Sequence, residues 1–217
     1  DKYVADYPFL AGAYDNSLEG YLYPKTYYIP AGSNADYVIR TLLSQFNTEM
    51  NNAGLSYNGN GTYSTAQLVT MASIIEKETS DENARYNVAS VLYNRLGQGM
   101  KLQVDPTIAY ALGSGYDGHA LTTDDLKVDS PYNTYTHEGL PPGPICSPSI
   151  SSIKAAYAPA TTDYLYYVTT ELDGTLTFAS NYDDFLAAKE RYKEVFGVST
   201  TTDEAIAAGD GATGDEQ

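Results

Sequence analysis

The chain has 217 residues, 42% of them apolar, which is enough for one fair-sized domain or a domain with a small appendage. It carries 12 basic and 28 acidic residues, a formal net charge of −16. This charge argues against a nucleic-acid binder, which needs a basic face to displace counterions, and against adhesion to an anionic membrane surface. A single cysteine and two distant histidines give no internal disulfide and no zinc-type spacing, so the sequence predicts neither metal nor cofactor.

The first half of the chain predicts a turn-rich start followed by helices. Residues 1–30 read as extended and rich in turns. Segment 34–54 has helical apolar spacing, with Asn34 as a cap and Gly54 as a stop. The next helix begins at Ser64, with Gln67 in capping-box spacing, and runs to about residue 79. A third helix is capped near 80–81 and stops at Gly97.

The second half predicts a strand, a long loop, a hairpin and more helices. Segment 99–113 reads as a short strand followed by a helix with Pro106 in its first turn. Residues 114–150 form a loop so long that it is either functional or disordered. The remaining elements are a short helix at 151–160, a hairpin at 163–170 and 174–180, and a final helix at 181–197. Residues 198–217 predict an acidic, disordered tail.

These elements predict an α+β fold of mixed helices with a small antiparallel sheet over residues 1–197. No stretch approaches the roughly 20 apolar residues of a membrane span, and no signal peptide is visible. Because Asp1 is not a natural start, we expect that an upstream export signal or anchor has been removed.

The segment "SIIEKETS" (73–80) places two carboxylates at the end of an apolar helix. At about 100° per residue, Glu76 and Glu78 both fall within the apolar arc, whereas Lys77 falls on the solvent face. A carboxylate that loses hydration has a raised pKa and can act as a general acid near neutral pH. The alternative is that both side chains reach water at the helix end or cap the next helix. Periodicity does not choose between the two glutamates.

Further polar groups lie on stiff or otherwise apolar segments, and they suit a neutral polyhydroxylated ligand such as a glycan better than phosphate or metal. They are Asn94, Arg95, Gln103, Asp105, Tyr132, Asn133, Thr134 and Tyr135. Structural alternatives stay open, because Asp105 can cap the Pro106 helix and Arg95 can pair with an acid.

Several long motifs resemble one family in their order along the chain. They are "LEGYLYPKTY", "ASIIEKET", "VASVLYNRL", "GMKLQVDPTIAYALG", "LTTDDLKVDSPYNTYTHEGLPPGPI" and "TDYLYYV". Over roughly residues 17–192 the chain resembles the YceG-like family of MltG-type endolytic murein transglycosylases. The resemblance implies a single catalytic domain with a long proline-rich active-site loop.

The resemblance also implies an activity. Such enzymes cut the β-1,4 bond after N-acetylmuramic acid in nascent, uncrosslinked peptidoglycan and leave 1,6-anhydro ends. The catalytic acid that the resemblance implies is the first glutamate of "EKET", which is Glu76, with no cofactor. The residues expected to bind sugar or support the acid are Glu78, Asn94, Arg95, Gln103, Asp105, Tyr132, Asn133, Thr134, Tyr135 and, more weakly, Glu19.

The resemblance further implies a place on the extracytoplasmic face of the bacterial cell membrane, beside peptidoglycan synthases. The transmembrane helix and LysM-like region that usually precede this domain are absent from the sequence. Two positions depart from the family pattern: Leu176 and Phe185 stand where histidines are usual. The glutamate mechanism needs neither histidine.

Two other functions remain open from the residues. One is a muramidase-type glycoside hydrolase, which would pair Glu76 with Glu78 or Asp105 as a second carboxylate. The other is a module that binds peptidoglycan without cutting it.

Overall fold

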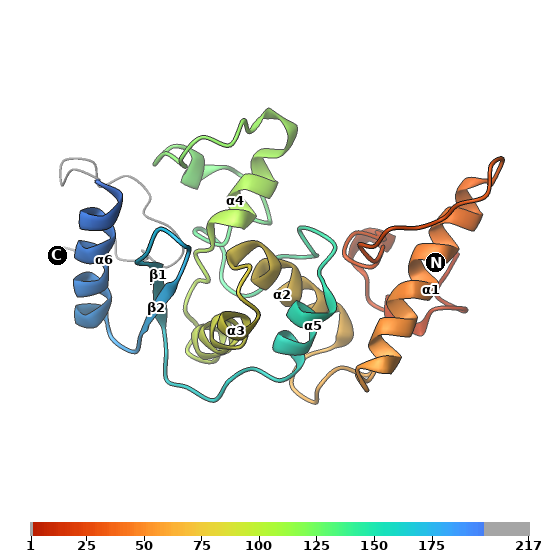
Figure 1. The fold of residues 1–217 in the computed structure, drawn as a ribbon, viewed down its shortest axis with the longest axis horizontal. Coiled ribbons are helices and arrows are strands. Elements are labelled where there is room, and N and C mark those ends of the chain that lie inside the picture. The colour runs from red at the N-terminus through yellow and green to blue at the C-terminus, as the bar shows by residue number, and fades with distance from the viewer. Residues whose placement is uncertain (1, 198–217) are drawn as a thin grey trace.

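The computed structural model describes residues 2–197. Within them lie six α-helices and one two-stranded sheet, which confirms the α+β prediction; residues 198–217, predicted as a tail, lie outside the described residues. In chain order the elements are α1 (Ala35–Asn52), α2 (Thr65–Glu78), α3 (Glu82–Gly97), α4 (Asp105–Leu112), α5 (Ile150–Tyr157), β1 (Tyr166–Thr169), β2 (Leu176–Ala179) and α6 (Tyr182–Phe196). Figure 1 shows α2 at the centre beside α3 and α5, with α1 at one end and the hairpin with α6 at the other.

The helix starts follow the predicted caps. Asn34 accepts a hydrogen bond from the Tyr37 amide at 2.9 Å, and Ser64 with Gln67 closes a complete capping box before α2. Asp81 caps α3 through the amide of residue 83. These side chains satisfy amides that have no partner inside their helix, each stabilising its helix by about 1 kcal/mol.

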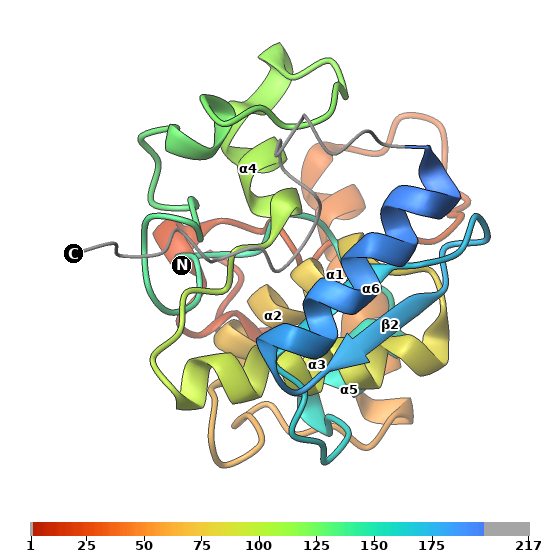
Figure 2. The same ribbon diagram turned by 90° about the vertical axis from the view of Figure 1, so that its left-hand side faces the viewer.

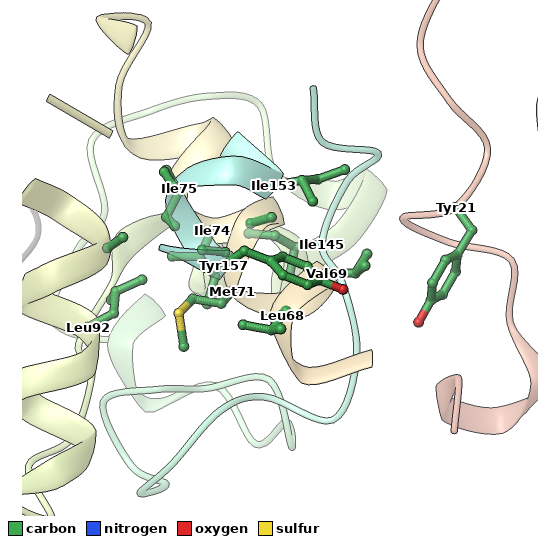
Figure 3. Close-up of a cluster of buried hydrophobic side chains, with 14 of the residues drawn as sticks. Tyr21, Leu68, Val69, Met71, Ile74, Ile75, Leu92, Ile145, Ile153 and Tyr157 are labelled. Atoms are coloured by element: carbon green, nitrogen blue, oxygen red, sulfur yellow. The ribbon is translucent and has the colours of Figure 1, made fainter. Parts of the chain in front are cut away.

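The core is built around α2. Its apolar residues Leu68, Met71 and Ile75 have no exposed surface, and they pack toward α3 and α5, as the cluster in Figure 3 shows. Burying one such side chain stabilises a fold by about 1.5–3 kcal/mol. The end of α2 is therefore held rigidly, which fixes the direction of the polar side chains in its last turn.

The predicted hairpin forms a small second layer with α6. Tyr166 pairs with Ala179, and Thr169 pairs with Leu176, in antiparallel register. Helix α6 lies across this hairpin (Figure 2), and the fully buried Phe185 stacks on Tyr166 at 5.2 Å between ring centroids. Phe185 therefore has a packing role between α6 and the hairpin.

The predicted strand at the start of segment 99–113 is wrong. No strand forms there, because Gln103 has a φ of +50°, in the left-handed region that interrupts an extended chain. The Gln103 amide instead donates to the Thr134 carbonyl at 3.1 Å. This bond connects the segment before α4 to the proline-rich loop, residues 129–145. The predicted helix with Pro106 in its first turn is confirmed as α4.

Gly20 fixes the N-terminal motif against the same loop. Its φ is +85°, and an added Cβ would lie 2.6 Å from side-chain carbons of Pro144. Only glycine fits this approach without displacing the proline. The neighbouring Glu19 is thereby brought to the edge of the proline-rich loop.

Candidate functional site

The last turn of α2 sends three consecutive side chains in three directions. Thr79 leaves the helix with φ −154° and ψ 143°, so Glu76, Lys77 and Glu78 occupy its final turn. Glu76 points toward the start of α5, Lys77 lines an open cavity, and Glu78 lies beside β1 and the start of α4. The two glutamates therefore sit in separate environments.

Glu76 is held as a carboxylate. Its Oε2 accepts from the Ser149 amide at 3.1 Å, the Ser149 hydroxyl at 2.6 Å and the Ser152 hydroxyl at 2.6 Å. Arg85 lies 3.5 Å from the other oxygen. Burial opposes ionisation, but the hydrogen bonds from Ser149 and Ser152 and the charge of Arg85 outweigh it, and the pKa of Glu76 is lowered. The direction of this pKa shift is the opposite of the one that burial alone would give.

Glu78 has the opposite electrostatic environment. Its Oε1 has no exposed surface and no hydrogen-bond partner among residues 2–197. Burial, followed by the nearby negative charge of Asp105, raises the pKa of Glu78 to about 8. The weaker influences of Tyr167 and Arg95 act in the other direction. Of the two glutamates, Glu78 is the one that stays protonated at neutral pH.

Two groups near Glu78 come from α4 and β1. Asp105, in the first turn of α4, accepts a hydrogen bond from the Tyr135 hydroxyl and does not cap its helix. Tyr167, on β1, has a buried hydroxyl that lies beside Glu78 without closing a regular hydrogen bond. Desolvation and the neighbouring Glu78 raise the pKa of Tyr167. This hydroxyl is thus a neutral donor beside the carboxyl group.

A cavity of about 530 Å³ opens beside Lys77 and Asp105. Its lining comes from α2, α4, the loop after α4, the proline-rich loop and α6: Lys77, Asp105, Pro106, Ala109, Tyr110, Tyr116, Ala120, Leu121, Ile145 and Tyr192. Rings with polar tips and few charges are typical of sites that stack on sugars. Glu78 is not among the lining residues; Lys77, which does line the cavity, precedes it in the chain, and Asp105, also in the lining, acts on its pKa.

The aromatic surface continues toward the N-terminal motif. Tyr110 packs against Tyr132 with the rings tilted by 47° and their centroids 4.7 Å apart, and both residues line a small pocket together with Glu19. Burial raises the pKa of Tyr132 to about 12, so its hydroxyl stays neutral. Tyr110 lines both pockets, and it therefore connects the cavity beside Asp105 with Glu19.

Asn94 and Arg95 act as structural anchors. The Asn94 amide donates to the carbonyls of Thr162 and Tyr164 at 3.0 and 2.8 Å. The Arg95 guanidinium donates to the carbonyls of Leu165 and Leu102 at 2.7 and 2.8 Å, with 2% of the residue exposed. Their polar atoms fix α3 to the chain before β1, so we assign them to scaffolding of Glu78.

The proline-rich loop is also held from within. The buried Asn133 amide donates to the carbonyls of Leu126 and Val128 at 2.9 and 2.8 Å. The Thr134 hydroxyl accepts from the Val104 amide at 3.0 Å. Asn133 and Thr134 therefore shape the loop, whereas Tyr132 and Tyr135 present their rings or hydroxyls toward the site.

Sequence reasoning missed three features of this region. The first is Tyr167, which is buried on β1 although "DYLYYV" shows no alternation that marks it. The second is the serine pair, Ser149 and Ser152, whose hydroxyls donate to the Glu76 carboxylate and favour its charged form. The third is Lys77, which is exposed as predicted but lines the cavity.

The fold and the site define an α+β domain with a buried carboxyl group of raised pKa near an aromatic cavity. The profile of the YceG-like family matches residues 3–191. The chain belongs to the YceG-like family, which confirms the resemblance.

Named relatives agree with this membership. A protein named endolytic murein transglycosylase from Bacillus subtilis (strain 168) is 40% identical over 176 residues, which cover 81% of this chain and 48% of that protein. One from Streptococcus pneumoniae (strain ATCC BAA-255 / R6) is 36% identical over 172 residues, 77% of this chain and 31% of that protein. A crystal structure of a YceG-like protein from Listeria monocytogenes matches with a TM-score of 0.76 and 36% identity, over 86% of this chain and 62% of that one. The chain thus spans half or less of the curated relatives' length.

Proposed function

We propose that this chain is the catalytic part of an endolytic murein transglycosylase, with Glu78 as its general acid and base. The names of the relatives support the reaction class. The observation that carries the residue assignment is the raised pKa of Glu78, about 8, together with its charge interaction with Asp105, which lines the aromatic cavity. The substrate is the glycan strand of nascent, uncrosslinked peptidoglycan, cut between N-acetylmuramic acid and N-acetylglucosamine.

In this mechanism Glu78 donates its proton to the glycosidic oxygen while the bond from that oxygen to the anomeric carbon breaks. The resulting carboxylate takes the proton of the muramic acid C6 hydroxyl, whose oxygen attacks the anomeric carbon. The products are a 1,6-anhydro end and a free 4-hydroxyl, Glu78 is protonated again, and no water is consumed. Intramolecular attack gives the nucleophile a high effective concentration.

A pKa near 8 suits both halves of this cycle. At neutral pH most of the molecules carry the proton that the first half needs, and the carboxylate formed is basic enough to accept one in the second. Burial and then the charge of Asp105 raise the pKa of Glu78, and the neutral Tyr167 hydroxyl is placed to donate to the carboxylate once it forms. The pKa of Glu76 is lowered instead, since despite its partial burial the hydrogen bonds from Ser149 and Ser152 favour the charged form.

The test compares Glu78→Gln with Glu76→Gln on uncrosslinked glycan strands, followed by mass analysis of the new ends. We expect Glu78→Gln to lose cleavage by at least about a thousandfold, while Glu76→Gln retains measurable activity once its folding is verified. Anhydro ends are lighter than reducing ends by one water, so the same spectrum separates transglycosylase from muramidase. Full activity of Glu78→Gln, with loss only in Glu76→Gln, would return the acid to Glu76.

A non-catalytic binding module makes a different prediction in the same experiment. Strands would bind equally to the wild type and Glu78→Gln, and no soluble fragments would form. A protonated acid beside the cavity is better suited to catalysis than to binding alone.

The cellular setting is proposed from the family alone. We place the domain at the extracytoplasmic face of the bacterial cell membrane, near peptidoglycan synthases. Among residues 2–197 no helix has the length and apolar content needed to cross a bilayer.

A further inference from the structure

Lys77 is a cation with no partner at the rim of the cavity. It lies between the two glutamates in α2, it is exposed, and it forms no hydrogen bond or ion pair with any residue in 2–197. Most other lysines and arginines in this range do have an acidic partner, such as Lys25 with Glu49 and Lys193 with Glu190. In a chain with a net charge of −16, an ammonium group that no acid neutralises is available for a ligand.

The cavity around Lys77 offers no second cation. Among the residues that line it, all within the described part of the chain, Asp105 is the other charged group, and it accepts from Tyr135. The remaining walls are aromatic or aliphatic, such as Tyr110 and Ile145. An ammonium group next to apolar walls is less screened than one on an open surface, so its pairing with an anion is stronger.

We propose that Lys77 binds a carboxylate of the glycan strand and thereby selects which strands are cut. This inference rests on the proposed function. Two carboxylates of such strands share the required chemistry. One belongs to the lactoyl group of muramic acid when the stem peptide is absent, and the other belongs to the stem peptide when it is attached.

Two physical arguments support a selective contact. The net negative charge of the protein repels an anionic polymer at long range, so local recognition needs a cation near the site. Lys77 is also one residue from Glu78 and points to a different side of the helix, so it can hold the substituent without entering the proton transfer. A contact that is equal in the ground state and the transition state changes KM and leaves kcat unchanged.

The test measures kcat and KM for wild type, Lys77→Gln and Lys77→Arg on four strand preparations of equal length. These carry stem peptides, stem peptides with carboxylates converted to methylamides, free lactoyl carboxylates after peptide removal, and lactoyl methylamides. Lys154→Gln, which removes an exposed lysine of α5 outside the cavity, is the matched control.

We expect Lys77→Gln to raise KM about tenfold on the preparation that carries the recognised carboxylate, with kcat retained, and to match the wild type on its methylamide. Lys77→Arg, which keeps the positive charge, should have a KM close to that of the wild type. An effect confined to peptide-free strands identifies the lactoyl carboxylate, and one confined to peptide-bearing strands identifies the stem. The inference would be overturned if Lys77→Gln raised KM by the same factor on charged and neutral strands. An equal rise of KM in Lys154→Gln would also overturn it.

A binding measurement separates this inference from the proposed activity. Calorimetry measures the binding of intact strands to two proteins, the single variant Glu78→Gln and the double variant that also carries Lys77→Gln. For each protein, every charged strand preparation is compared with its methylamide. A preference for charge that disappears with Lys77→Gln supports the carboxylate contact even if the wild type cuts no strand. Equal binding of charged and neutral strands contradicts it, whatever the cleavage assay shows.

Discussion

Glu78→Gln should make the protein more stable at pH 8 than the wild type, although the same change removes the proposed catalytic acid. The folded protein holds Glu78 in its neutral form up to a pKa of about 8, because burial and Asp105 disfavour the charge. The unfolded chain releases this proton near the ordinary value of 4.5. Between these values the folded state binds one more proton than the unfolded state. The free energy of unfolding of the wild type therefore falls as pH rises.

The size of the effect follows from this difference. Each unit of pH in the window reduces the free energy of unfolding by at most about 1.4 kcal/mol, so the loss between pH 5 and pH 8 is about 3 kcal/mol. Glutamine carries no charge in either state, and Glu78→Gln removes this contribution. Other titrating groups, such as Asp36 and His119, are common to both proteins and cancel when the two are compared.

The assay is urea unfolding of both proteins at pH 5 and pH 8, followed by circular dichroism. We expect similar stability at pH 5 and an advantage of about 3 kcal/mol for Glu78→Gln at pH 8. Glu76→Gln is the matched control: its pKa is lowered, so the stability it contributes is present above about pH 4.5 and is lost only at lower pH. This control should be destabilised by about 2 kcal/mol at both pH values. A difference between wild type and Glu78→Gln that is the same at pH 5 and pH 8 would refute the burial of this carboxyl group.

Two further substitutions test the scaffold by the same unfolding assay. Phe185→Ala should cost about 3–4 kcal/mol, because the ring is fully buried between α6 and the hairpin, and a loss below about 1 kcal/mol would contradict that packing. Gln103→Gly should gain up to about 1 kcal/mol, since glycine adopts the φ of +50° without strain, and a clear loss of stability would show that the glutamine side chain holds this turn.

The helices of this fold were predictable because their signals are local. Asn34, Ser64 and Asp81 supply caps that depend only on the next few residues, and the apolar spacing after each cap defines the buried face. The strand that was wrongly predicted before α4 shows where reasoning from local signals fails. Its extended conformation is interrupted at Gln103, whose amide bonds to Thr134, 31 residues away in the chain. A contact at that separation leaves no periodic trace in the sequence.

Local signals also could not predict the directions of the pKa shifts of Glu76 and Glu78. The helical periodicity correctly placed both glutamates within the apolar arc of α2 but could not tell what each would meet there. Glu76 meets Ser149 and Ser152 at the start of α5, whereas Glu78 meets Asp105. These partners come from segments far along the chain, and they decide the direction of each pKa shift. The motif therefore placed two candidate acids without showing which of them has the raised pKa.

The three residues at the end of α2 meet three different environments because a helix turns by about 100° per residue. Glu76 contacts the start of α5 and Arg85, and these partners favour its charged form. Glu78, two residues later, faces nearly the opposite way, into the buried space beside Tyr167, where burial favours its neutral form. Lys77 projects between them into the cavity. Insertion of one residue before Glu76 would rotate all three out of place, so their spacing follows from the geometry of the helix end as much as from the chemistry of each side chain.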